Sequence, residues 1–170
     1  LFHHDGERAV AKAAEKFGEG IRYAPSHQQS NSLVLTLRHR YAESLTRASD
    51  FRHALAVYQE IKQTRPDDER ARLNVIELML RLGQTEAGLR ELDELANAYQ
   101  KRAEFSKLIS VLEGLVQSYP NDQVLLQRLA ESHLQGGNVT KAIEVWDSLG
   151  ELQLSAGEKQ AAAGTIRQII

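Results

Sequence analysis

Helix-breaking and helix-capping residues recur in this sequence at one fixed distance. Pro66 and Pro120 are 54 residues apart (120 − 66). Three more pairs keep the same distance: Phe51 and Phe105, Asp68 and Asp122, and Gly83 and Gly137. Proline ends helices because it lacks an amide hydrogen, whereas aspartate caps the free amides at a helix start. The recurrence therefore predicts a chain built from copies of one helical unit.

Between these residues the apolar positions follow helical spacing. In the segment that Asp50 caps and Pro66 stops, one face carries Phe51, Ala54, Leu55, Tyr58 and Ile61. The preceding segment, 33–48, is expected to bury its own stripe of Leu33, Leu37, Tyr41, Leu45 and Ala48. No segment alternates with the period of a strand. Because such short helices are marginal alone, they must pack on one another. We expect an all-α fold with three helices per unit and a last unit cut off at Ile170.

Composition excludes several functional classes. The chain of 170 residues has no cysteine, which excludes disulfides, thiolate metal sites and cysteine nucleophiles. A formal net charge of -2 offers no broad positive field for nucleic acid. No apolar run approaches the ~20 residues that a membrane span needs. We predict neither a nucleic-acid nor a membrane partner, and a cytoplasmic location.

Four stretches resemble the tetratricopeptide repeat. In the first, Tyr41-Ala42 stand at the first-helix pair, Ser49-Asp50-Phe51 at the turn, Ala54 at the helix crossing and Pro66 at the end. Further copies are built around Leu95-Ala96 with Tyr99, Leu129-Ala130 with Trp146, and Leu149-Gly150 with Ala162.

The resemblance implies a right-handed superhelical α-α solenoid of antiparallel helices over residues 33–170. Residues 1–32 would then form an N-terminal helix and a polar loop. The copies start 34 and then only 20 residues apart (103 − 83 and 157 − 137 are each 20), so the segments 85–102 and 139–155 would each serve two copies. That spacing departs from the family's regular 34-residue period.

Catalytic and metal-binding motifs are missing. The six histidines show no ligand spacing. Asp67, Asp68 and Glu69 follow Pro66 directly, where helix capping explains them better than a metal. We predict no enzymatic activity, no cofactor and no metal.

Some tetratricopeptide domains clamp a terminal carboxylate with Lys, Asn and Arg on successive first helices. The equivalent positions here are His39, Glu43, Leu73, Glu77, Asp93, Asn97, Gln127 and Glu131, so that clamp is absent. If first helices do line a groove, its candidate residues are His39, Glu43, Leu73, Glu77, Leu80, Arg81, Asn97, Glu131 and Leu134. Such a mixed acidic and apolar lining suits an amphipathic or extended segment with basic residues. It is equally open that the three leucines pack against neighbouring helices.

The resemblance implies a protein–protein interaction scaffold whose partner is a protein or peptide. Because the sequence starts without Met and ends within an apolar helical pattern, we expect it to be a segment of a larger, bacterial protein. The alternative is a self-association module. Ile166, Ile169 and Ile170 would lack their next helix at the open end of the array and could pair with a second copy as a homodimer.

Overall fold

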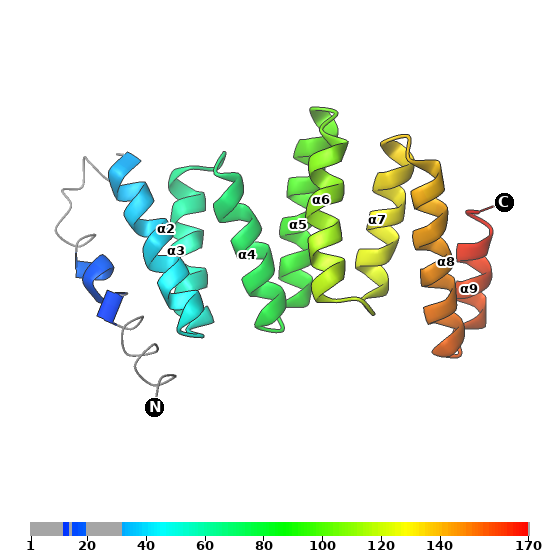
Figure 1. Ribbon diagram of the computed structural model, residues 1–170, viewed down its shortest axis with the longest axis horizontal. Coiled ribbons are helices and arrows are strands. Elements are labelled where there is room, and N and C mark those ends of the chain that lie inside the picture. Colours follow the sequence, from blue (N-terminus) through cyan, green and yellow to red (C-terminus); the bar gives the residue numbers. More distant parts are fainter. Residues whose placement is uncertain (1–11, 14, 20–31, 170) are drawn as a thin grey trace. The chain divides into compact units, whose positions relative to one another are not determined.

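The computed structural model describes residues 12, 13, 15–19 and 32–169, and this part of the chain is helical without a strand. The helices are α2 (Ser32–Arg47), α3 (Phe51–Thr64), α4 (Glu69–Arg81), α5 (Thr85–Lys101), α6 (Phe105–Ser118), α7 (Gln123–Gln135), α8 (Val139–Ser155) and α9 (Lys159–Ile166) (Figure 1). The predicted all-α fold is confirmed. Three helices, α3 to α5, are followed by three of the same lengths, α6 to α8, as the repeat predicts.

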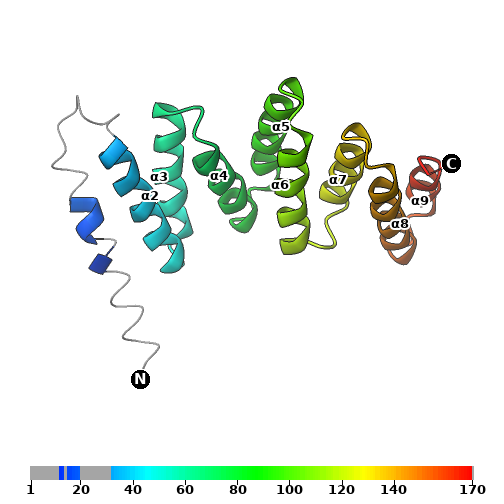
Figure 2. The same ribbon diagram turned by 45° about the horizontal axis from the view of Figure 1, so that its top comes forward.

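The helices belong to two compact units, Leu1–Leu95 and Ala96–Ile170. In unit 1, α2 packs on α3 and α3 on α4; in unit 2, α6, α7, α8 and α9 pack in chain order (Figures 1 and 2). Helices adjacent in sequence are thus adjacent in space, which is the packing of an α-α solenoid. The predicted boundary after residue 32 falls beside the undescribed range 20–31 and stays a prediction.

Aspartates begin three of the helices, as their spacing predicts. Asp68 Oδ1 accepts a hydrogen bond from the Ala71 amide at 2.8 Å, and Asp122 Oδ1 accepts from the Leu125 amide at 3.0 Å. Asp50 accepts from the His53 amide at 3.4 Å. Each carboxylate satisfies an amide that the first helical turn leaves without a partner.

Five helix ends share one turn, in which a residue with positive φ closes the helix. The residues are Ser49 (φ 60), Gly83 (φ 73), Ala103 (φ 54), Gly137 (φ 81) and Gly157 (φ 80). At Gly83 the amide donates to the Leu80 carbonyl and the next amide, of Gln84, donates to the Met79 carbonyl, and the other four turns repeat this pair of bonds. The turns are 34, 20, 34 and 20 residues apart, which gives the irregular repeat a local cause (83 − 49, 103 − 83, 137 − 103, 157 − 137).

We expect Ala103→Gly to stabilise the protein by about 1 kcal/mol, because glycine removes the steric cost of a left-handed alanine. The matched control is Ala156→Gly. Ala156 ends α8 with φ -78 and ψ -4, so glycine there should destabilise by about 0.5–1 kcal/mol. Urea unfolding measures both free energies. Changes of the same sign in the two variants would contradict the assigned turn.

The core of unit 1 is formed where α2, α3 and α4 meet. Its buried residues are Ala42, Leu45, Ala54, Leu55, Tyr58, Ile61, Ala71, Val75, Leu78 and Met79. The predicted face of α3 is confirmed, although Phe51 is only half-buried. The predicted stripe of α2 is wrong at its ends: Leu33 is 65% exposed and Ala48 is exposed. That helix instead buries Val34, Arg38, His39, Ala42 and Leu45.

The core of unit 2 includes one cluster built from α7 and α8. It consists of Leu126, Ala130, Ala142, Trp146 and Leu149, and Ile169 packs against it from the segment after α9. Trp146 and Leu149 are thereby buried at the positions that the repeat pairs with Leu92 and Leu95, which are buried as well.

Burial of Tyr58 makes unit 1 less stable at alkaline pH. Burial first, then the carboxylates of Glu77 and Asp68, raise the pKa of Tyr58 from 10.0 to about 12. Because the folded pKa is raised, this contribution is fully present below pH 10 and is lost as pH rises to 12. We expect the free energy of unfolding to fall by roughly 2 kcal/mol across that window. In Tyr58→Phe the free energy of unfolding, measured with urea at a series of pH values, should fall less between pH 10 and 12. The same dependence on pH as in the wild-type protein would contradict the assignment.

Candidate functional site

The predicted groove residues of unit 1 lie in different surroundings. His39 is 7% exposed, and its Nε2 hydrogen-bonds the cap Asp68 at 2.8 Å, so it holds α2 against the start of α4. Leu80 is buried, and Leu73 is half-buried. These three contribute little surface to a partner.

The charged groove residues of unit 1 are paired within the protein. Glu43 forms an ion pair with Arg70 from α4. Glu77 accepts a hydrogen bond from Arg81 at 3.1 Å, and the Arg81 guanidinium lies 5.0 Å from the centre of the Phe51 ring. A partner would have to compete with these contacts.

In unit 2 the remaining candidates, Asn97, Glu131 and Leu134, are exposed. Glu131 lines a cavity that is described below. It accepts a hydrogen bond from Gln127 at 3.0 Å, and no cation of the described part of the chain forms an ion pair with it. Its negative charge is therefore available to a partner.

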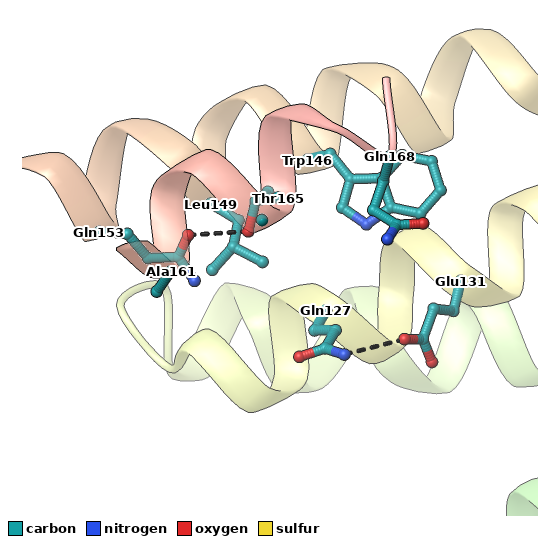
Figure 3. Close-up of a pocket in the computed structure, with 9 residues that line it drawn as sticks. Gln127, Glu131, Trp146, Leu149, Gln153, Ala161, Thr165 and Gln168 are labelled. Carbon is teal, nitrogen blue, oxygen red and sulfur yellow. Dashed lines mark hydrogen bonds between the residues drawn. The ribbon is translucent and has the colours of Figure 1, made fainter. Parts of the chain in front are cut away.

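The cavity has a volume of about 380 Å³ and lies among α7, α8 and α9 (Figure 3). We call it the α7–α9 cavity. Its lining residues are Gln127, Glu131, Trp146, Leu149, Gln153, Ala161, Gly164, Thr165 and Gln168. The α8 residues Trp146 and Leu149 are buried at its base, whereas the polar residues Gln127, Glu131 and Gln168 are exposed at its rim, together with Ala161 and Gly164 of α9. The cavity thus joins an apolar base to a polar rim.

A line of hydrogen bonds fixes one side of the cavity. The Thr165 hydroxyl donates to Gln153 Oε1 at 2.8 Å, as Figure 3 shows, and both side chains are buried. Gln153 Nε2 lies 3.4 Å from Gln123 Oε1, and Gln123 in turn donates to Glu158 at 3.1 Å. Since buried polar groups in such a line are partnered, the α8–α9 contact keeps one arrangement.

Sequence reasoning missed most of this cavity. The repeat does contain a signal for its polar side, because Gln153 and Thr165 take the positions that Tyr99 and Val111 hold one unit earlier (153 − 99, 165 − 111). Polar residues at apolar repeat positions mark a place where one unit departs from its own pattern.

Within the described residues, no group of three or more His, Asp or Glu side chains is placed to hold a metal ion. The helices of that same part of the chain include none long and apolar enough to cross a membrane. That the protein lacks enzymatic activity stays a prediction.

A comparison of the sequence with models of known protein families supports the predicted repeat. Residues 45–112 match the model of the tetratricopeptide repeat family. A search of curated proteins finds no match.

Solved structures with similar folds include a tetratricopeptide repeat protein from Parabacteroides merdae, 15% identical with a TM-score of 0.45 over 99% of this chain and 88% of that one. YrrB, described as a TPR protein with an unusual peptide-binding site, is 9% identical with a TM-score of 0.39 over 93% of this chain and 88% of its own. MamA from Desulfovibrio magneticus is 14% identical, with a TM-score of 0.37 over 97% and 93%.

The family match shows a tetratricopeptide-like repeat over residues 45–112, within a helical array whose unit has three helices in place of the regular helix pair. Repeats of this family are in general scaffolds without catalysis, and the match indicates a protein-interaction module.

Proposed function

We propose that this protein is an interaction scaffold that holds a segment of a protein partner in the α7–α9 cavity. The observation that carries the proposal is the cavity itself, with buried Trp146 and Leu149 beneath an exposed polar rim. An apolar base supplies the favourable burial, and a few polar groups around it fix orientation. YrrB, by its description, binds a peptide on a TPR fold, which is consistent with a peptide here.

The charge of the rim favours a basic or neutral segment. Glu131 is the single charged residue among those that line the cavity, and Gln127 and Gln168 offer amide donors and acceptors beside it. A lysine or arginine of the partner would supply the cation that Glu131 lacks, which is a stronger hydrogen-bond pair than a neutral one.

Self-association through the C-terminal end is the second candidate. Ile166 is 43% exposed and Leu154 is 53% exposed, so apolar surface is present on α8 and α9. Ile169 is engaged with the unit 2 core, and Ile170 lies outside the described residues. Of the three predicted isoleucines, Ile166 is thus the one whose side chain the structure describes as exposed.

Ala161 and Ala163 offer a matched pair for a test. Both are exposed on α9, but Ala161 lines the cavity and Ala163 does not. Peptides selected from a displayed random library against the wild-type protein should bind Ala161→Tyr at least tenfold more weakly, because the ring fills the cavity. Their affinity for Ala163→Tyr should not change. Isothermal titration calorimetry measures the three affinities, and equal binding to all three proteins would contradict the proposal.

A further inference from the structure

A second cavity, in unit 1, lies beside a buried arginine, Arg38, whose Nε has no hydrogen-bond partner among the described residues. The cavity has a volume of about 300 Å³, and its wall is formed by α2, α3 and Gly18. Its lining includes Arg38, Tyr41, His53, Val57 and Glu60. We call it the Arg38 cavity.

Arg38 is 7% exposed, and its Nε has no hydrogen-bond partner. Within the described residues no carboxylate forms an ion pair with its guanidinium. An arginine cannot avoid the free-energy cost of a buried charge by losing its proton, since its side chain stays charged at any ordinary pH. Burial of an unpaired charge is strongly unfavourable, so the site calls for an anion.

The charges on the two helices agree with an anionic occupant. The stretch 32–64, which holds α2 and α3, has five Lys and Arg against three Asp and Glu, a net charge of +2 (5 − 3) in a chain of net charge -2. Two of the acids are already paired, Glu43 with Arg70 and Asp50 with His53 at 2.7 Å. Glu60, on the exposed rim, is the one acid among the lining residues.

The shape of the cavity selects a carboxylate side chain. The guanidinium is a planar fork that matches a carboxylate with two parallel hydrogen bonds. The other wall is apolar, with Ala56 and Val57, and the Tyr41 ring lies against Gly18. We propose that the Arg38 cavity binds a glutamate or aspartate side chain of a partner segment whose neighbouring residues are apolar. This site is distinct from the α7–α9 cavity and does not depend on the function proposed there.

The test uses the full chain and two peptides that differ in one charge. Acetyl-Val-Glu-Val-amide should shift the Nε–H resonance of Arg38 in a saturable way, and acetyl-Val-Gln-Val-amide should bind at least tenfold more weakly. Arg38→Met should lose the difference between the peptides, whereas Arg40→Met, an exposed arginine on the same helix, should retain it. Glu60→Gln should bind the glutamate peptide more tightly, because a like charge leaves the rim.

Stability provides a second readout that needs no ligand. Arg38→Met should raise the melting temperature of the free protein, because it removes an unpaired buried cation, and Arg40→Met should leave it unchanged. The proposal is overturned if both peptides bind alike, if inorganic phosphate binds as well as the glutamate peptide, or if Glu60→Gln lowers the melting temperature and abolishes binding. That last result would make Glu60 the partner of Arg38 in solution.

Discussion

Replacement of Ala54 by arginine should unfold unit 1. Ala54 is 0% exposed in the core where α3 packs between α2 and α4. Larger side chains in a close-packed core force neighbouring groups out of place, and a buried charge adds its desolvation cost. Together they should cost at least about 4 kcal/mol, a large fraction of the stability of an ordinary domain. Circular dichroism and urea unfolding measure the loss of helix and of free energy.

The control for this prediction is Gln63→Arg. Gln63 lies on the same helix but is exposed, so an arginine there should change stability by less than about 0.5 kcal/mol. An unchanged melting temperature in Ala54→Arg would mean that α3 does not cross its neighbours at this residue.

Leu125→Ala should destabilise unit 2 by about 3–5 kcal/mol, through lost burial and the cavity that remains. Leu125 is 0% exposed on α7, whose end is also joined to α8 by the turn at Gly137. The adjacent Val124 is 44% exposed, and Val124→Ala should cost less than about 0.5 kcal/mol.

The two variants test whether α7 presents the face that the structure assigns to it. A helix rotated by one residue would reverse the order of the two effects. Urea unfolding followed by tryptophan fluorescence suits this pair, because Trp146 belongs to the same unit and packs near α7.

The parts of the fold that the sequence predicts best are those with local causes. Asp68 and Asp122 cap helices through bonds that reach only three residues along the chain. Gly83 and Gly137 adopt positive φ because glycine does so at no steric cost. Such signals need no tertiary contact, so the helix ends follow from the residues alone.

The face that a helix buries is less predictable, because it depends on its neighbours. In α2 the apolar positions suggested Leu33 and Ala48, yet the helix buries Arg38 and His39. The Nε2 of His39 is hydrogen-bonded to Asp68, which follows 29 residues later. A polar residue buried by a partner so distant gives no periodic signal.

The residues of the proposed site follow from the sequence only in part. Glu131 was a candidate because it lies on a helix that resembles the first helix of a repeat. The α7–α9 cavity also needs residues of α9, which resembles the second helix of a repeat and therefore offered no candidate. Spacing of 34 and 20 residues lets α8 serve two copies, so residues from three consecutive helices meet there. A regular repeat of two helices does not predict that residues of three consecutive helices line one cavity.

The solution mass, measured by light scattering after size exclusion over a concentration series, tests the central claim most directly. If the protein is a scaffold for another protein, its mass stays at the monomer value of 19.1 kDa throughout. A dimer that grows with concentration and is abolished by Ile166→Glu would contradict that claim and show that the exposed apolar end binds a second copy.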